Sequence, residues 1–512
     1  MPRRTSPRSL ALAVPSLIAI AALTACAGGQ SAAPSGGSAG AGAADPDAVV
    51  TIGSENEPTS LDQIFGGSSG VTEAFTGNVY EGLFRITDDA EVEPLLAAST
   101  DVSEDGLEYT FTLQDAEFHS GDPVTAQDVK YSLDRFISEQ SIAARKRQLS
   151  VIESVTAVDD STVAVRLKTP SISFTYNLGY VWIVNDTAGD LTAAEDGSGP
   201  YTLTDYRKGD SISLEPFDGY WGDAPANGGV VYQYYADPTA LDNALLTGAV
   251  DLVTGQSTPD ALPQFSDENS FTIIEGTSTT KNLLAFNDRV APFDNVSVRK
   301  AVYSAIDREK LLDSIWDGRG ELVGSMVPPS EPWYLDLVDE NPYDPELAES
   351  LLAEAGYADG FSFTIDTPDS GVQSTVAEFL KSELAKVGIT VDIRIITDDE
   401  WYQKVYTEHD FQATLQTHVN DRDINFYANP DFYWGYDNPE VQTWLAEAEA
   451  AASTDEQTEL VKKANQKIAE DAASAWLYLE PQLRISTAQI TGVPQNGLNS
   501  LFYVSGIEKV AS

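Results

Sequence analysis

Few side chains in this sequence have the types and the spacing that could do chemistry. The run from Gly66 to Gly70 satisfies the Gly-x-Ser-x-Gly pattern of a hydrolase nucleophile elbow. That elbow needs a hydrophobic strand directly before it, and residues 61–65 (LDQIF) make a poor one. Three glycines among five residues are more typical of a flexible loop, so we do not expect an enzyme.

Metal chemistry is poorly supported as well. Asp421, Asp423 and Asn425 are spaced like the start of a calcium loop, but Phe426 replaces the required glycine and Phe432 the bidentate glutamate. With one cysteine and three histidines, the chain can form neither an intrachain disulfide nor a cysteine-based zinc site. We therefore predict no metal site and no cofactor.

The composition narrows the class of partner. The 512 residues include 30 Lys and Arg against 80 Asp and Glu, which gives a formal net charge of −50. A surface this acidic repels a phosphate polyanion, so we exclude nucleic acid as a partner. An anionic membrane repels it too, which leaves only a covalent or a spanning attachment. The hydrophobic fraction of 42% is large enough to build two or three domain cores.

The N-terminus has the layout of an export signal. Arg3, Arg4 and Arg8 form a positive region, and a short apolar stretch follows up to residue 25. This stretch is too short to span a membrane comfortably and is typical of a secretory signal. We predict a signal peptide over residues 1–25.

Cys26, the only cysteine, stands directly after this stretch and follows a small residue. The arrangement resembles the bacterial lipobox, in which the signal is cut before the cysteine and the thiol is diacylated. Residues 26–46 would then be the lipidated Cys26 and a flexible Gly/Ala/Ser linker. The alternative is a signal peptide with an incidental cysteine. We expect a lipid anchor on the outer face of the cell membrane.

The globular body reads as an α/β protein. Alternating apolar residues predict strands near residues 49–52, 109–113, 163–167 and 389–395. One helix is expected to start at Asp294 or Asn295 and to continue towards Gly318. A second helix is expected to start at residues 344–345 and to stop at Gly356. A third is expected to end at residues 387–388, directly before the strand at 389–395.

Several segments carry a family resemblance. They are PTSLD at 58–62, VYEGL at 79–83, PLLA at 94–97, DGLEYTF at 105–111, FHSGDPVTAQDVKYSL at 118–133, GPY at 199–201, GYWG at 219–222 and PFDNVSVRKA at 292–301. In this order they resemble the bacterial extracytoplasmic solute-binding proteins of the dipeptide/oligopeptide/nickel class, solute-binding protein family 5. The similarity runs over nearly the whole mature chain.

The resemblance implies a two-lobed, periplasmic-binding-protein-like clamshell (type II) with an extra subdomain on the first lobe. The expected order is lobe I at 47–79, the extra subdomain at 80–194, lobe I again at 195–278, lobe II at 279–480 and a return to lobe I at 481–512. Crossings between the lobes are expected near residues 276–282 and 479–483. Ligand would be trapped between the lobes, and closure would follow from contacts to both of them.

The resemblance also indicates candidate ligand-binding residues. Peptide binders of the family carry a Trp-x-x-Asp-Tyr-x-Asp-Pro-like segment whose first Asp pairs with the ligand's α-amino group. Here the matching stretch is residues 418–425, in which His418 replaces the Trp and Asp421 stands at the anchor position. Asp421 is the expected amine anchor, or else a solvated loop acid. Arg422 could meet a ligand carboxylate, or pair internally with Asp421 or Asp423.

Three aromatic residues are further candidates for the pocket lining. Trp401 follows the expected strand at 389–395, and Tyr180 and Trp182 precede the GPY segment. Each could equally be ordinary core material.

The leading functional hypothesis is therefore a lipoprotein that captures di- or oligopeptides and delivers them to the permease and ATPase subunits of an ABC importer, as a monomer. A nickel or metal-chelate binder of the same family is the alternative, because that branch can present a histidine where His418 stands. A hydrolase is the alternative from another class.

The anchoring hypothesis makes a direct prediction. Changing Cys26→Ala removes the only thiol that can carry acyl chains, so the variant should be released into the medium instead of remaining with the membrane fraction. Cell fractionation followed by immunoblotting measures this, with Ser31→Ala in the linker as the control. Unchanged membrane retention of the Cys26 variant would rule out lipidation at this residue.

Overall fold

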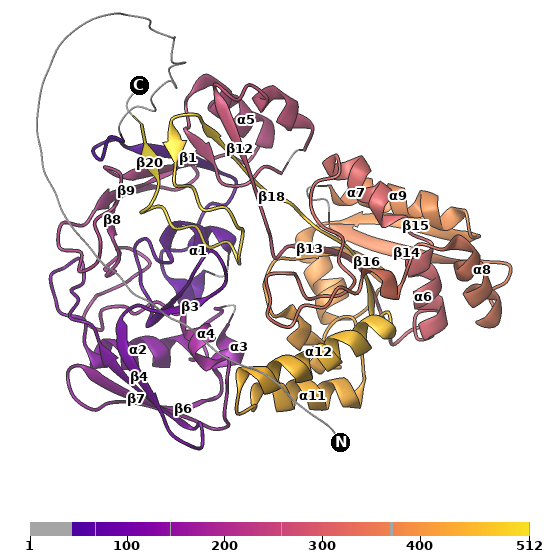
Figure 1. The fold of residues 1–512 in the computed structure, drawn as a ribbon, viewed down its shortest axis with the longest axis horizontal. Helices are drawn as coiled ribbons and strands as arrows, with labels where there is room; N and C mark the ends of the chain where they lie inside the picture. Colours follow the sequence, from indigo (N-terminus) through magenta and orange to yellow (C-terminus); the bar gives the residue numbers. More distant parts are fainter. Residues whose placement is uncertain (1–43, 67, 144, 258, 369–371, 511–512) are drawn as a thin grey trace, which may run out of the picture. The chain divides into compact units, whose positions relative to one another are not determined.

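The structure, a computed structural model, describes residues 44–66, 68–143, 145–257, 259–368 and 372–510. The strands form three main sheets, of seven, five and four strands, and two sheets of two strands (Figure 1). Helices lie between these strands along the chain, so the architecture is mixed α/β.

The seven-stranded sheet combines strands from distant parts of the chain. Its order is β12 (Phe271–Gly276), β18 (Gln482–Thr487), β11 (Leu252–Val253), β1 (Val50–Ser54), β10 (Val230–Tyr234), β9 (Ser211–Pro216) and β8 (Tyr201–Arg207). β1 is parallel to β10 and β11, and the remaining pairs are antiparallel. Val50 and Ile52 of the central strand are fully buried, as the alternating pattern predicts for one covered face.

The four-stranded antiparallel sheet is formed by residues that lie between β1 and β8 of the seven-stranded sheet along the chain. Its order is β4 (Ala97–Val102), β5 (Glu108–Leu113), β7 (Thr162–Leu167) and β6 (Ile152–Ala157). Helix α2 (Ala126–Phe136) packs on β6 and β7 and begins with a capping box formed by Thr125 and Asp128. This sheet has its own apolar core, which makes it a subdomain.

The five-stranded sheet forms the second large core. Its order is β15 (Ile389–Ile396), β14 (Phe361–Pro368), β16 (Ala413–His418), β13 (Lys281–Phe286) and β17 (Ser474–Leu479). All residues of β13 and β17 are buried. We call this sheet with its helices the second lobe, and the seven- and four-stranded sheets together the first lobe.

The remaining elements connect and cover these sheets. The helices are α1 (Ser69–Phe75), α3 (Lys146–Leu149), α4 (Phe174–Leu178), α5 (Pro238–Thr247), α6 (Val296–Ser304), α7 (Arg308–Trp316), α8 (Pro345–Glu354), α9 (Gln373–Ala385), α10 (Asp398–Trp401), α11 (Pro439–Glu449) and α12 (Thr454–Glu470). Short helical turns are η1 (Gln63–Phe65), η2 (Pro259–Phe265), η3 (Val338–Glu340), η4 (Tyr402–Thr407) and η5 (Asp423–Ala428). The two-stranded sheets pair β2 (Phe84–Ile86) with β3 (Val92–Pro94), and β19 (Ile490–Thr491) with β20 (Glu508–Lys509).

The chain passes between the two large sheets twice. It leaves β12 at Gly276 and enters β13 at Lys281, and it leaves β17 at Leu479 and enters β18 at Gln482. These are the stretches in which the sequence analysis expects the crossings. The crossings are hydrogen-bonded to each other, because the amide of Glu480 donates to the carbonyl of Thr280 at 2.9 Å.

The element predictions are confirmed with one exception. The four expected strands are β1, β5, β7 and β15. The helix expected to start at residues 344–345 is α8, and the helix expected to end near residues 387–388 is α9. The prediction of one helix from Asn295 towards Gly318 is wrong, because this stretch forms two helices. α6 ends at Ser304, and Asp307 caps α7 by accepting a hydrogen bond from the amide of Lys310.

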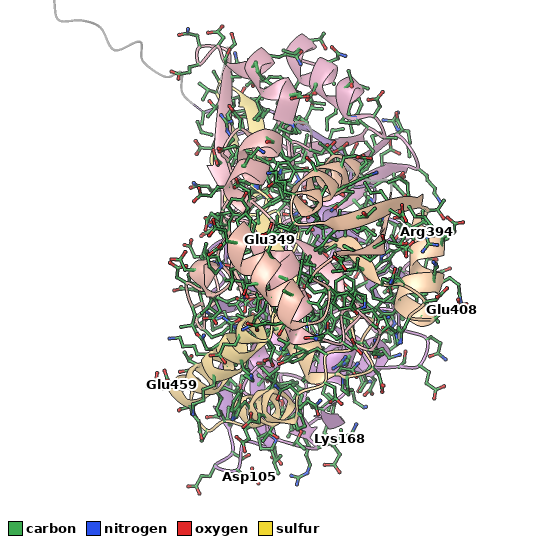
Figure 2. All side chains as sticks on the ribbon, turned by 90° about the vertical axis from the view of Figure 1, so that its right-hand side faces the viewer. Asp105, Lys168, Glu349, Arg394, Glu408 and Glu459 are labelled. Atoms are coloured by element: carbon green, nitrogen blue, oxygen red, sulfur yellow. The ribbon has the colours of Figure 1, made fainter. Side chains whose placement is uncertain are left out.

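Charged side chains cover the outside of the described chain. Glu349, Glu408 and Glu459 project outward in Figure 2 and are exposed. None of the helices in the described ranges has the length and apolarity needed to cross a bilayer. The predicted signal peptide, Cys26 and the linker up to residue 43 lie outside the described residues.

Candidate functional site

One edge of the five-stranded sheet carries the candidate site. Lys281 at the start of β13 pairs with His418 at the end of β16 and with Leu479 at the end of β17. Because these neighbours are antiparallel, the residues just beyond them, Thr280, Val419 and Glu480, leave the sheet at the same edge. Both crossings and the loop after β16 therefore meet there.

A buried charge network holds the loop after β16 in place. The ammonium of Lys281 is fully buried, donates to the carbonyl of Asn420 and lies 3.3 Å from a carboxylate oxygen of Asp423. His418 is 3.3 Å from the same carboxylate oxygen through Nδ1 and 2.9 Å from the Tyr433 hydroxyl through Nε2. Burial would raise the pKa of Asp423, but Lys281 and His418 outweigh it and lower that pKa.

These contacts change the interpretation of His418. Both of its ring nitrogens have partners inside the second lobe, so neither is free to ligate a metal ion or a solute. The structure places His418 beneath the loop, where it positions Asp423 and the residues before it. Over the described ranges, no group of three or more His, Cys, Asp or Glu side chains is arranged to hold a metal.

Asp421 is paired with an arginine of the first lobe. The Arg145 guanidinium donates to a carboxylate oxygen of Asp421 at 2.6 Å, and both side chains are about nine-tenths buried. Arg145 also lies over the Tyr180 ring, 3.8 Å from its centroid. The Tyr180 hydroxyl accepts a hydrogen bond from Asn499, whose side-chain oxygen accepts one from the amide of Asp421. The carboxylate predicted to bind a ligand amine thus has an internal partner.

Arg422 is in a different situation. Its φ of 55° lies in the left-handed region, which is uncommon for a residue with a side chain. Its amide donates to the Glu331 carboxylate at 2.7 Å, which fixes this turn. Its guanidinium lies 3.5 Å from the Tyr176 ring centroid and 5.1 Å from that of Trp333. Arg422 forms no ion pair with Asp421 or Asp423 in the structure, because Asp421 pairs with Arg145 and Asp423 with Lys281 and His418.

No carboxylate of the described chain comes within ion-pairing distance of the Arg422 guanidinium. Desolvation lowers the pKa of Arg422, since a charge withdrawn from water without a counter-ion is disfavoured. A buried guanidinium of this kind is stabilised when an anion binds to it.

A cavity of about 350 Å³ opens beside these arginines, and we call it the arginine cavity. Its walls come from both lobes. It is lined by Arg145, Arg147, Gln148, Val151, Ser173, Asn177, Asn420, Asp421, Arg422, Asp423, Asn425, Phe426, Ala428, Gln442, Leu445, Ala446 and Glu449. A cavity of this size suits a small solute or one end of a larger one.

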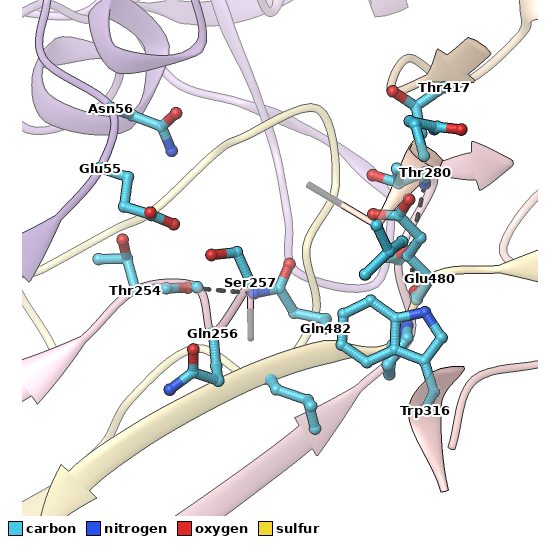
Figure 3. A pocket seen from close by; sticks show the side chains of 16 residues that line it. Glu55, Asn56, Thr254, Gln256, Ser257, Thr280, Trp316, Thr417, Glu480 and Gln482 are labelled. Carbon is cyan, nitrogen blue, oxygen red and sulfur yellow. Dashed lines mark hydrogen bonds between the residues drawn. The ribbon is translucent and has the colours of Figure 1, made fainter. Parts of the chain in front are cut away.

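A second cavity of about 280 Å³ lies where the chain crosses between the sheets, and we call it the crossing cavity (Figure 3). Glu55 and Asn56 line one side of it, and Thr280 and Glu480 line the other. Burial raises the pKa of Glu480 to about 7. Burial also raises the pKa of Glu55.

A smaller cavity adjoins each of the two named cavities. One, of about 110 Å³, shares Asn56, Thr280 and other residues with the crossing cavity and is also lined by Val419. The other, of about 70 Å³, shares Arg145 and Asn420 with the arginine cavity. Residues of the loop after β16 therefore line three cavities: Val419 the 110 Å³ cavity, Asn420 the 70 Å³ cavity and Asn420–Asp423 the arginine cavity.

The three predicted aromatic residues occupy different places. Tyr180 lines the 70 Å³ cavity beneath Arg145. Trp182 is buried in the first lobe, where it stacks on Tyr80 at 4.4 Å and donates to the Thr76 hydroxyl. Trp401 donates to the Thr414 hydroxyl and packs on Tyr433 in the second lobe. Trp182 and Trp401 therefore stabilise the individual lobes.

Sequence reasoning missed two residues that the site depends on. Arg145 stands in the run Arg145-Lys146-Arg147, a concentration of positive charge that is unusual in so acidic a chain and could have singled it out. Glu480 gave no signal, because it follows a strand of apolar residues and precedes a proline.

Three comparisons with known proteins bear on this geometry. The family model described as bacterial extracellular solute-binding proteins, family 5, middle region, matches residues 91–446. The glutathione-binding protein GsiB of Pectobacterium atrosepticum is 27% identical over 480 residues, which cover 87% of this chain and 91% of the relative.

Solved structures share the fold. The binding protein AgaA of A. tumefaciens R10, in complex with agropinic acid, matches with a TM-score of 0.76 and 25% identity over 91% of this chain and 99% of that one. DppA of Helicobacter pylori, in complex with the peptide STSA, matches with a TM-score of 0.77 and 23% identity over 90% and 98%. These are two-lobed binding proteins, as the sequence analysis expects of this chain.

The Arg145–Asp421 pair generates a stability prediction. Either Arg145→Gln or Asp421→Asn alone leaves a buried charge without its partner and should lower the free energy of unfolding by about 3–5 kcal/mol. The double variant should lose much less than the sum of the two. Denaturant unfolding of the four proteins measures the coupling. Arg85→Gln, which breaks the exposed pair with Glu93, is the control and should cost at most about 1 kcal/mol. Strictly additive losses would contradict a direct interaction.

Proposed function

We propose that this protein binds a peptide with a free carboxylate. The chain belongs to the bacterial extracellular solute-binding proteins of family 5, which are the solute-binding components of ABC importers. The peptide would be captured between the two lobes and passed to the membrane permease. One observation carries the choice of ligand: the guanidinium of the half-buried Arg422 has no ion-pair partner in the described chain and lines the arginine cavity.

The surroundings of Arg422 suit a carboxylate. Its planar guanidinium can donate two parallel hydrogen bonds to a carboxylate, and Tyr176 holds the plane from one side. The Arg145–Asp421 pair beside it is neutral as a unit, and the carboxylates of Glu331 and Glu449 lie nearby without forming an ion pair with Arg422. Asn177 and Asn420 supply neutral polar groups on the same wall. A peptide carboxylate would supply the missing negative charge.

The relatives agree with this choice of ligand. GsiB of P. atrosepticum is named for binding glutathione, and DppA of H. pylori was solved with the peptide STSA. Hollow space along the loop after β16 gives room for an elongated solute. The metal-chelate alternative loses its main support, because His418 has partners on both ring nitrogens.

We also propose that the protein acts outside the cytoplasm as a lipoprotein. The basic N-terminus, the short apolar stretch and Cys26 support this. An anchor at Cys26 followed by a flexible linker would keep the binding protein near its permease while leaving the lobes free to move.

The carboxylate site can be tested with one variant and one chemical change in the ligand. Tetra-alanine with a free carboxylate should bind the unmodified protein more tightly than its C-terminal amide. Arg422→Gln should weaken binding of the free acid by about 2–5 kcal/mol, the range for removing one partner of a buried charge pair, and should abolish the preference over the amide. Isothermal titration calorimetry measures both ligands.

Arg147→Gln is the matched control, because it removes a positive charge from an exposed residue that lines the same cavity. It should leave the preference for the free acid intact. If Arg422→Gln and Arg147→Gln discriminate equally between acid and amide, Arg422 is not the carboxylate site.

A further inference from the structure

Glu480 is a negatively charged counterpart of Arg422, because its carboxylate has no cationic partner in the described chain. Glu480 lines the crossing cavity, and among the described residues the only side chain that donates a hydrogen bond to its carboxylate is Asn282, at a long 3.4 Å. No Lys, Arg or His of the described chain lies within ion-pairing distance of it. Burial raises its pKa to about 7, which is the expected response of a carboxylate that lacks a cationic partner.

The backbone fixes Glu480 in this position. Its amide donates to the carbonyl of Thr280, and its carbonyl accepts a hydrogen bond from the Ser278 hydroxyl at 2.5 Å. These bonds hold the backbone of Glu480 at the contact between the two crossings. The side chain therefore starts from a fixed point at the junction of the lobes and lines the crossing cavity.

The surroundings of Glu480 are acidic or neutral. Glu55, which follows β1 of the first lobe, faces it from the opposite side of the cavity (Figure 3). The other polar side chains of the lining are hydroxyls and amides from Asn56, Thr254, Gln256, Ser257, Ser278, Thr280, Gln373, Thr417 and Gln482. The half-buried Glu480 and the exposed Glu55 thus contribute carboxylates from two lobes to a cavity that no described Lys, Arg or His lines.

We propose that the crossing cavity binds the α-ammonium group of the peptide ligand, with Glu480 as its principal partner. The inference rests on the proposed function, in which Arg422 binds the other end of the same peptide. An ammonium ion between Glu480 and Glu55 supplies the positive charge that both carboxylates lack and contacts both lobes at once. Asp421 does not take this role, because Arg145 occupies its carboxylate.

The spacing of the two sites sets the length of the ligand. Val419, Thr280 and Glu480 leave three adjacent strands, and neighbouring strands are about 4.8 Å apart, so Glu480 lies about 10 Å from the start of the loop after β16. Arg422 is three residues further along that loop, which adds at most about 10 Å. A peptide rises by about 3.3 Å per residue, so the separation of the strands alone corresponds to about three residues and the whole interval to at most about six.

The test uses alanine peptides of two to six residues, each with a free and with an acetylated N-terminus. For the unmodified protein, acetylation of tetra-alanine should weaken binding at least tenfold, and affinity should peak between three and six residues. In Glu480→Gln the acetylated and free peptides should bind alike. Glu321→Gln is the matched control, because Glu321 is exposed and pairs with the same strand but does not line the cavity.

A second readout is the release of protons on binding, which does not depend on the acetylated peptides. Binding an ammonium should ionise Glu480, so calorimetry at pH 7 in buffers of different ionisation enthalpy should show proton release by the unmodified protein. Glu55 is the only other ionisable carboxylate in the described lining, and Glu55→Gln should leave most of the release in place.

The outcomes separate this inference from the proposed function. If acetylation costs Glu480→Gln as much as the unmodified protein, or if di-alanine binds as tightly as tetra-alanine, the crossing cavity is not the amine site. The acid-over-amide preference at Arg422 can survive that result. If the unmodified protein instead binds the free acid and the amide alike while acetylation still weakens binding, Arg422 is not the carboxylate site and Glu480 remains the amine site.

Discussion

The two crossings of the chain lie side by side, and the rest of the site depends on that contact. Residues 277–280 and 480–481 are bonded to each other through Thr280 and Glu480, and residue 278 pairs with Gly497 of the segment that returns to the first lobe. Three stretches that are far apart in the sequence are thereby held at one edge of the five-stranded sheet. Ser278, Thr280, Glu480 and Pro481 of these stretches line the crossing cavity.

This constraint explains which charged side chains at the edge of the sheet are paired and which are not. Lys281, fully buried at the start of β13, is neutralised by Asp423 and by the carbonyl of Asn420, and in return it fixes the loop that presents the following arginine. Arg145 reaches that loop from the first lobe and neutralises Asp421. Arg422 remains positive at one end of the hollow space, and Glu480 remains negative at the other. Among the described residues, Arg422 is thus left without an ion-pair partner at one end, and Glu480 and Glu55 at the other, separated by a distance that an extended peptide can span.

The fold could be predicted from sequence in most respects, because its signals are local. Alternation identified β1, β5, β7 and β15, and caps identified the starts of α6 and α8. The split between α6 and α7 was missed although Asp307 carries the capping signal, since the apolar stripe continues through Ala305 and Ile306. The family resemblance placed the crossings, which no local pattern could have located.

The site could be predicted only in part, because its pairs are distant in sequence. The segment from His418 to Arg422 was identified, but the partner that occupies Asp421 is 276 residues away and cannot be inferred from spacing. The engagement of His418 by Asp423 and Tyr433 depends on how the loop folds back on itself. Glu480 is one of 80 acidic residues, and its isolation from every described cation becomes visible only when the crossing is built.

The most direct measurement is a crystal structure of the protein grown with tetra-alanine. Our account predicts that the peptide lies along the loop after β16, with its carboxylate bonded to the Arg422 guanidinium, its ammonium beside Glu480 and the Arg145–Asp421 pair unbroken. A peptide that contacts only one lobe, or whose ammonium displaces Arg145 from Asp421, would contradict it.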